Sequence, residues 1–445
     1  MSTAVALIDG EHYPPVVRAA LSALSVEFDV VAAAFVGGTE KIDVEHGEVY
    51  GLPVVWAESA DESVRMAIDQ YHPHALVDLS DEPVLSAKDR FRLASIALGA
   101  GVEYRGADFC FTPPRSMLAL GTPALAVVGT GKRVGKTAVS AYLARRVKSQ
   151  GVDVVVLAMG RGGPAVPDLI RGDEVPLSTD DLLALAAQGK HAASDNYEDA
   201  VMSRVTTVGC RRCGGGMAGD TFFSNVHEGA RLADSLGKDI VIVEGSGAAI
   251  PPVRVDATLL VIGAGQGLSY IEEYFGPYRL GRADAVVLAG AEAPGATEKQ
   301  VAEAKSAIER IRPGVPVAAV IFRPSPLEAI AGKRVFFATT APSSLVPILV
   351  AHLESEHGCT VVGSSPHLSD RTRLREDMAS AAGRFDVLLT ELKAAAIEVV
   401  AMAGREMGVP TVLCDNVPQA VAGDDLDGLL DSVVHAAATR EAGVS

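Results

Sequence analysis

The sequence predicts an α/β protein whose parallel sheets are covered by helices on both faces. Short, continuous apolar runs alternate with segments of helical spacing along the whole chain, and strands buried on both faces are typical of parallel sheets. A glycine-rich loop joins one apolar run to a helix within residues 124–140, as in nucleotide-binding sheets. The chain has 445 residues, which is too many for one ordinary core, so several domains are expected.

We expect three parts. An N-terminal α/β domain over residues 1–122 ends in a proline-containing boundary, FTPPRSMLALGTP. A central phosphate-loop NTPase domain covers residues 123–332, and a C-terminal α/β segment, Rossmann-like as the first part is, covers residues 333–445. The sequence leaves open whether the first and last parts complete one another as a single layered unit.

In the first part, a strand is predicted over residues 3–9 and a helix over residues 14–24, with proline in its first turn. Helices are also expected through residues 66–71 and over residues 86–98. Further strands are predicted at EFDVVAAAFVGG, PVVWA, HALVDLSD and VEYRGA.

The central part begins with the strand of the glycine-rich loop and a helix to Gln150, which Gly151 closes. Residues 161–220 lack a clear pattern, and we expect a loop-rich, functional region there. A helix is predicted over about 297–310, and a terminal helix with a frayed tail ends the chain. Strands are predicted at DVVVLAMG, IVIVEGSG, ATLLVIGAG, ADAVVLAGAE, VPVAAVIF, RVFFATTA, CTVVGSS, FDVLLTEL and PTVLCDN.

Composition excludes several classes of function. Lys and Arg number 39 against 56 Asp and Glu, and the net charge of −17 opposes general attraction to nucleic acid or to an anionic membrane. No apolar run approaches membrane-spanning length and no basic region precedes the apolar start, so we expect a cytoplasmic protein. Five cysteines predict reduced thiols. A small anionic substrate must be held by a local basic cluster, and the oligomeric state is left open, with a homodimer as one alternative.

The segment ALAVVGTGKRVGKTAVS has the parts of a site for a nucleoside triphosphate. Glycines let backbone N–H groups turn inward, while a helix N-terminus, a lysine and a hydroxyl supply charge and a metal ligand. We expect Lys136 to contact the β- and γ-phosphates of ATP and Thr137 to bind Mg²⁺. The residues expected to cradle the nucleotide are Gly129, Thr130, Gly131, Lys132, Arg133, Val134, Gly135, Lys136, Thr137 and Ala138.

The loop departs from the common phosphate-loop pattern at Thr130, where that pattern has glycine. In this departure, and in its GT and VGKT segments, it resembles the loop of dethiobiotin synthetase. Lys132 and Arg133 are a second unusual feature. They would stabilise a transferring phosphoryl group or hold a second phosphorylated molecule, and a solvated salt-bridge surface is the alternative.

Carboxylates for a metal site are expected in two places. Glu244 ends an apolar strand just before a glycine turn, at the sheet edge where ligands collect. A similar Glu-Gly-x-Gly element binds the metal in the dethiobiotin synthetase group, and a simple strand-end charge is the alternative. A second metal carboxylate is predicted at Asp180 or Asp181, where a helix N-cap is the competing interpretation.

Arginines beside glycines predict an anion clamp. Arg211 and Arg212 precede a triple glycine, and Arg161 follows a strand and precedes two glycines, although a solvated turn is the alternative there. Cys210 and Cys213 have the spacing of half a zinc site, but a buried or structural thiol pair is preferred because the chain has no second C-x-x-C.

Several polar strand ends carry weaker hypotheses. His12, in DGEHYPP, binds phosphate or transfers a proton, or is a structural turn histidine. In the last part, SPHLSDR contains His367, Asp370 and Arg371, and LTELKAAA contains Glu391 and Lys393.

The whole chain resembles the cyclic 2,3-diphosphoglycerate synthetase family. The resemblance extends over residues 7 to about 416, so it is not confined to the nucleotide site. The matching segments are LIDGEHYPPVV, VVGTGKRVGKTAVSAYLAR, VLAMGRGGP, TVGCRRCGGGMAGDTFFSNV, VIVEGSGAAIPPV, LLTELKAAAIEVVA and VLCDN.

This resemblance implies an ATP-dependent ligase that joins the two phosphates of 2,3-bisphosphoglycerate into an intramolecular phosphoanhydride, with release of ADP and phosphate. The γ-phosphoryl group passes to one substrate phosphate, and the other phosphate attacks that centre and expels inorganic phosphate. The protein's task is to position and neutralise many negative charges. The expected catalytic residues are Lys136, Lys132, Arg133 and Arg211; the expected substrate-binding residues are Arg161, Arg211, Arg212 and His12; the expected metal ligands are Thr137, Glu244, Asp180 and Asp181.

Two alternatives are kept open. One is a dethiobiotin synthetase-like ligase that acts on another anionic metabolite. The other is a nucleotide-switched regulator that resembles partition ATPases. Against the second stand Gly131, at the place of that group's signature lysine, and the absence of an obvious C-terminal amphipathic membrane helix in the sequence.

Overall fold

The computed structural model describes residues 1–38, 47–114, 117–174 and 177–440. Residues 115–116 of the expected proline-containing boundary and the expected frayed tail at 441–445 lie outside these ranges. The chain forms two compact units, one made of residues 1–115, 268–282 and 307–313 and the other of the remaining residues. The predicted division at 122 and 332 stays a prediction.

The first unit contains a six-stranded sheet in the order β3-β2-β1-β4-β5-β6, parallel except at its β5–β6 edge. Helix α2 is capped by Ser59, and α3 begins with a capping box between Ser86 and Asp89. Its elements are β1 (Ser2–Ile8), α1 (Pro14–Leu24), β2 (Phe28–Phe35), β3 (Val54–Val55), α2 (Ala60–Tyr71), β4 (Ala75–Asp78), α3 (Ala87–Gly99), β5 (Glu103–Arg105), β6 (Cys110–Phe111), α8 (Ser269–Glu272) and α9 (Gly276–Gly281), with a 3-10 turn at residues 47–50.

The second unit is built on one thirteen-stranded sheet in the order β11-β10-β8-β12-β7-β13-β14-β15-β19-β18-β16-β17, with β9 paired to β10. Its strands are β7 (Ala124–Gly129), β8 (Val154–Gly160), β9 (Asp168–Arg171), β10 (Thr206–Gly215), β11 (Thr221–Ser224), β12 (Ile240–Glu244), β13 (Ala257–Gly263), β14 (Ala285–Ala289), β15 (Val317–Pro326), β16 (Arg334–Ala338), β17 (Thr360–Ser365), β18 (Val387–Glu391) and β19 (Thr411–Ala420).

Two helices of this unit, α5 and α6, lie in the region that the sequence predicted to be loop-rich. The α-helices of the unit are α4 (Lys136–Ser149), α5 (Thr179–Ala187), α6 (Asp195–Ser203), α7 (Val226–Asp234), α11 (Val346–His357), α12 (Arg371–Ser380), α13 (Met402–Met407) and α14 (Leu426–Arg440). A 3-10 turn covers residues 264–266, a π-helix covers residues 396–401, and α10 (Glu298–Ile311) is divided between the two units.

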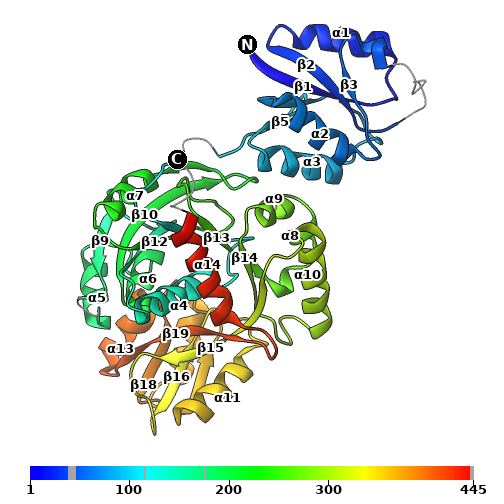
Figure 1. Cartoon of the computed structure of the whole chain (residues 1–445). Helices are drawn as coiled ribbons and strands as arrows, with labels where there is room; N and C mark the ends of the chain where they lie inside the picture. The colour runs from blue at the N-terminus through cyan, green and yellow to red at the C-terminus, as the bar shows by residue number, and fades with distance from the viewer. Residues whose placement is uncertain (39–46, 115–116, 175–176, 441–445) are drawn as a thin grey trace. The chain divides into compact units, whose positions relative to one another are not determined.

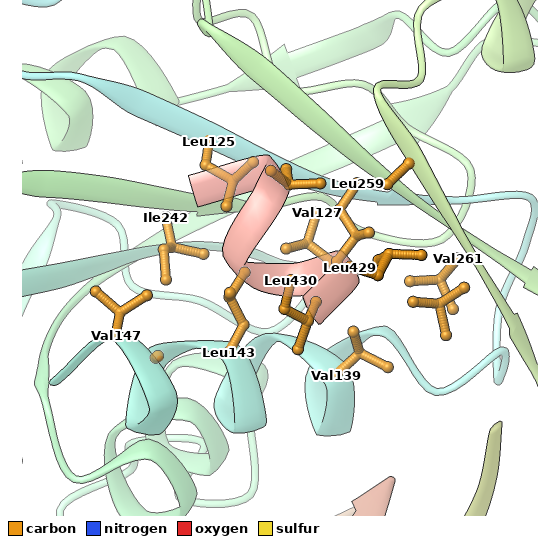
Figure 2. Packing of buried hydrophobic residues seen from close by; sticks show 14 of the residues in the cluster. Leu125, Val127, Val139, Leu143, Val147, Ile242, Leu259, Val261, Leu429 and Leu430 are labelled. Carbon is orange, nitrogen blue, oxygen red and sulfur yellow. The ribbon is translucent and has the colours of Figure 1, made fainter. Parts of the chain in front are cut away.

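Helices cover both faces of the phosphate-loop strands, so the predicted α/β class is confirmed. On one face, Leu429 and Leu430 of α14 pack with Val139 and Leu143 of α4 against the central strands, as Figure 2 shows. Figure 1 shows the same C-terminal helix in red beside α4. On the other face, Val226 and its neighbours on α7 pack against β8 and β12. The last residues of the chain therefore stabilise the sheet that carries the glycine-rich loop.

The last strands continue this sheet in the reverse direction. Strand β15 pairs in parallel with β14 through Val317–Val320, and its later residues pair antiparallel with β19. Strands β19, β18, β16 and β17 are parallel to one another, so this block runs opposite to the phosphate-loop strands. The first and last parts of the chain thus belong to separate sheets, which lie in separate compact units.

The expected loop-rich region at 161–220 is wrong in large part. It contains β9, α5, α6 and β10. Helix α6 is hard to find from the sequence because it is short and buried on all sides: the polar residues Asn196, Glu198, Asp199 and Ser203 are buried as fully as the apolar residues between them.

Candidate active site

The glycine-rich loop joins β7, which is buried along its whole length, to the first turn of α4. Gly135 stands at the turn with a φ of +88°, and a Cβ there would lie 2.3 Å from the Phe322 ring. Lys136 Nζ donates to the carbonyl of Gly131 over 3.2 Å, and the residue is only 8% exposed. Burial lowers the pKa of Lys136, and Glu244 works against that shift. The loop therefore holds its lysine folded inward.

Two loop residues reach other parts of the unit. Thr130 Oγ1 donates to Gln266 Oε1 over 2.6 Å, which gives a role to the residue that replaces glycine. Arg133 adopts a φ of +62°, which is uncommon for a residue with a Cβ, and its Nη2 donates to Ser369 Oγ over 3.1 Å. Lys132 and Arg133 are both exposed.

Glu244 lies where the sequence predicted a metal carboxylate. It ends β12, next to β7 in the sheet, and Thr137 Oγ1 donates to its Oε1 over 2.8 Å. The residue is 3% exposed, and burial raises the pKa of its carboxyl. Glu244 also has the carboxyl of Asp199 beside it, and the two buried carboxyls share a hydrogen bond when Asp199 is protonated. Two carboxyl groups and a hydroxyl so close together suit a hard cation, which would replace that proton.

Helix α6 supplies carboxylates that the sequence reasoning missed. Asp199 is completely buried, and burial together with the neighbouring charge of Glu244 raises its pKa well above the usual range. Asp195 lies against Gly160, where a Cβ would be 3.3 Å from its Oδ2, and its charge acts on Lys136. The signal in the sequence was Ser194 followed by acids at positions that share one helical face.

Asp180 and Asp181 lie at the start of α5. Asp181 Oδ2 accepts from the backbone N–H and the hydroxyl of Ser178, over 2.8 and 2.6 Å, in a capping box. These hydrogen bonds lower the pKa of Asp181. Asp180 is exposed. The capping alternative describes Asp181 well, and a metal role for either residue stays a prediction.

Arg161 and Arg212 converge on the glycine turn that follows Glu244. Arg212 Nη2 donates to the carbonyl of Ser246 over 2.7 Å. Gly247 has a φ of +64°, and a Cβ there would lie 2.6 Å from Arg161 Nη2 and 3.2 Å from Arg212 Nη2. Burial, and then the charge of Arg161, lower the pKa of Arg212. Two guanidinium groups side by side form a ready fork for an oxyanion.

Arg211 and Arg212 are consecutive residues of a strand, so their side chains leave opposite faces of the sheet. The Arg211 guanidinium lies 5.8 Å from the centre of the Phe223 ring. Its role in substrate binding stays a prediction. The cysteines on the same strand are both free thiols: Cys210 is buried and Cys213 is exposed. In the described part of the chain, no group of three or more His, Cys, Asp or Glu side chains is arranged to hold a metal ion.

His12 belongs to the first unit. Its Nδ1 lies 2.7 Å from Asp9 Oδ1, and this hydrogen bond raises the pKa of the imidazole. Asp9 also accepts from the backbone N–H groups of Glu11 and His12, so the histidine has a structural role in this turn. A substrate-binding role for His12 stays a prediction.

Six cations, on the phosphate loop, just after β8 and on β10, lack acidic partners in the part of the chain that the structure describes. Among the described residues, no Asp or Glu oxygen lies within 4.0 Å of their charged nitrogens, although acids outnumber bases in this chain. On α4 the neighbouring cations do pair: Arg145 with Asp415 at 2.8 Å, and Arg146 with Asp431 at 2.6 Å. An anionic ligand is the natural partner for the cations that remain. They are Lys132, Arg133, Lys136, Arg161, Arg211 and Arg212.

Fold and site together define an enzyme of the phosphate-loop, nucleotide-binding class. Three family models match successive stretches of the chain: cyclic 2,3-diphosphoglycerate synthetase N-terminal domain at residues 3–112, P-loop domain at 124–321 and C-terminal domain at 326–417. The chain belongs to the cyclic 2,3-diphosphoglycerate synthetase family.

Relatives with that name are similar over nearly the full length. The protein of Rubrobacter xylanophilus is 48% identical, over 98% of this chain and 98% of its own. Those of Methanothermus fervidus and Methanothermobacter thermautotrophicus are 44% and 47% identical, over 97% and 98% of this chain and 95% and 96% of theirs. Across the residues that the structure describes, no helix is long and apolar enough to span a membrane.

Proposed function

We propose that this protein is an ATP-dependent ligase that closes 2,3-bisphosphoglycerate into cyclic 2,3-diphosphoglycerate, with release of ADP and phosphate. The observation that carries the proposal is the group of cations around the phosphate loop that lack carboxylate partners in the described structure. ATP and a bisphosphorylated acid bring many negative charges together, and such a site must supply compensating charge.

Lys136 and the loop N–H groups hold the nucleotide phosphates. The Lys136 ammonium is buried and donates to the Gly131 carbonyl, without a carboxylate partner among the described residues, so it is available to the β- and γ-phosphates. Thr137 and Glu244 fit Mg²⁺, because the Thr137 hydroxyl lies against the Glu244 carboxyl and the Asp199 carboxyl lies beside them. When bound, Mg²⁺ neutralises phosphate charge and orients the γ-phosphoryl group.

The substrate's phosphates lie between two groups of cations. Arg161 and Arg212 bind one phosphate at the Gly247 turn, and Lys132 and Arg133 approach from the phosphate loop. One substrate phosphate attacks the γ-phosphorus and ADP leaves. The second substrate phosphate then attacks the phosphorus still attached to glycerate, the new phosphoanhydride forms, and inorganic phosphate leaves.

Phosphorus NMR tests this proposal. Purified protein with ATP, Mg²⁺ and 2,3-bisphosphoglycerate is expected to give ADP, inorganic phosphate and an intramolecular anhydride signal in equal amounts. ATP hydrolysis without that signal would contradict the proposed product. Turnover only with another anionic metabolite would favour the dethiobiotin synthetase-like alternative, and turnover without any acceptor would favour the regulatory ATPase.

A further inference from the structure

The reversed strand block reaches the nucleotide site through a partly buried lysine. Lys393 follows β18, and its Nζ lies 3.1 Å from Glu198 Oε1 on α6. Burial works against the charged ammonium, but Glu198, Glu391 and Asp415 more than offset it and raise the pKa of Lys393. The ion pair therefore joins two segments that are far apart in the sequence.

The neighbouring carboxylates have partners of their own. Asp415 pairs with Arg145 at 2.8 Å, and Glu391 accepts from the hydroxyls of Thr339 and Thr340 over 2.5 and 2.6 Å. Lys393 is the cation paired with Glu198, whose carboxyl is 9% exposed. Burial raises the pKa of Glu198 to about 8, and Lys393 opposes that rise, so without the lysine this carboxyl becomes a buried neutral group and the ion pair that ties α6 to the segment after β18 is lost.

The backbone around Lys393 is unusual. Ala394 has a φ of +48°, a conformation that disfavours residues with a Cβ. A π-helix starts two residues later and covers residues 396–401. π-Helical turns occur mostly at functional sites, and local strain persists only where the surrounding structure enforces it. A strained backbone segment, Ala394 and the π-helix at residues 396–401, therefore directly follows Lys393.

Glu198 lies on the helix that carries the missed carboxylates. Asp195 precedes it by three residues and Asp199 follows it directly, so a shift of α6 at Glu198 moves both. Asp199 interacts with Glu244, the partner of Thr137, and the charge of Asp195 acts on Lys136. The placement of α6 therefore sets the surroundings of the phosphate-loop lysine and of Glu244.

We propose that Lys393 is a positioning residue for catalysis, which through Glu198 holds α6 so that Asp195 stays against Gly160 and Asp199 stays beside Glu244. This inference rests on the proposed function, since it concerns the same phosphoryl-transfer site. Without Lys393, the ion pair that holds α6 is lost and the helix shifts. A misplacement of about 1 Å at a reacting site lowers kcat by about 100-fold while it changes binding much less.

The test compares Lys393→Met, Glu198→Gln and the double variant with the wild type, by kcat, by KM for ATP and by thermal unfolding. Lys393→Met is expected to lower kcat about 100-fold with KM for ATP within about twofold. In the Glu198→Gln background the ion pair is already absent, so the same substitution is expected to lower kcat less than about tenfold. Lys393→Arg keeps the charge and is expected to rescue most of the loss.

Lys305→Met is the matched control. Lys305 donates to both oxygens of Asp424 over 2.7 Å, and Asp424 also holds the start of β15 through the Ala319 N–H. This variant is expected to lose stability and keep its kcat. The inference is overturned if Lys393→Met also loses stability but keeps its kcat. It is overturned too if Lys393→Met lowers kcat by the same factor in the Glu198→Gln background as in the wild type.

Two further outcomes separate the role of Lys393 from protein folding and from the proposed function. Should Lys393→Met fail to fold, Glu198→Gln alone is expected to lower kcat by about tenfold, and an unchanged kcat there would also overturn the inference. If the wild-type protein forms no cyclic product, the proposed function is contradicted. If the wild type is active and Lys393→Met and Glu198→Gln keep its kcat, only the role of Lys393 is contradicted.

Discussion

The Thr137 hydroxyl donates a 2.8 Å hydrogen bond to Glu244, which joins the first turn of α4 to the end of β12. This contact brings together two of the four residues that the sequence assigned to a metal, although 107 positions separate them. It is possible because β7 and β12 are neighbours in the sheet and their carboxyl ends meet at one edge.

Glu244→Gln is expected to lower kcat at least about 100-fold and to raise the Mg²⁺ concentration needed for half-maximal rate, because the amide lacks the charge that holds the cation. ADP release measured over a range of Mg²⁺ checks this. Asp181→Asn is the comparison: its carboxylate is used in a capping box, so we expect a loss of about 1 kcal/mol in stability and an unchanged Mg²⁺ requirement. A changed requirement would support the metal role predicted for Asp181.

Lys136→Ala is expected to abolish turnover, because the buried ammonium is the cation that the loop aims at the β- and γ-phosphates. ADP release and binding of a fluorescent nucleotide measure the effect. Lys299→Ala, on α10, removes an exposed cation and should leave both unchanged. Substantial turnover by Lys136→Ala would remove this lysine from the mechanism.

Arg212→Ala is expected to raise KM for 2,3-bisphosphoglycerate by about tenfold or more, since a charge-assisted hydrogen bond contributes about 1.5–3 kcal/mol. Arg211→Ala is predicted to act chiefly on the same KM. The Arg211 guanidinium lies over the Phe223 ring, on the face of β10 opposite to Arg212. The two variants therefore test which face of the strand binds the substrate. Unchanged kinetics for Arg211→Ala would exclude Arg211 from the site.

Gly247→Ala is expected to raise KM for 2,3-bisphosphoglycerate with little change in KM for ATP. A Cβ at 2.6 Å from Arg161 Nη2 forces that guanidinium away from Arg212. Gly151→Ala is a matched control, because Gly151 also has a positive φ, +83°, but a Cβ there meets nothing within 4 Å. Both variants should lose stability, and an equal KM in the two would contradict the arginine clamp.

His12 is expected to make the stability of the protein depend on pH. Its folded pKa is raised above 6.5 by the hydrogen bond to Asp9, so its contribution is complete below pH 6.5 and is lost as pH rises through the folded value. Denaturant unfolding at several pH values from about 5.5 to 8 measures this loss. His12→Gln should flatten that part of the profile, and an identical slope in the variant would contradict the assignment.

Much of the candidate site could be predicted from the sequence because its parts are local. Strand, glycine loop and helix are contiguous from Ala124 to Ser149, so the phosphate loop needs no tertiary information. Glu244 could be found because a strand end followed by a glycine turn is also a local pattern. The burial of the α6 carboxylates could not be predicted, since acidic residues on a short helix are normally expected on its solvent face, and only the tertiary structure covers that face.

By itself, the sequence determined the α/β class, the phosphate loop and the family, because each depends on residue order and short-range spacing. Only the tertiary structure decided which distant side chains meet. Arg161 and Arg212 converge on Gly247, Asp199 lies with Glu244, and Lys393 pairs with Glu198 across the reversed strand block. Strand order and direction set these contacts, and they arise from long-range pairing that no local pattern encodes.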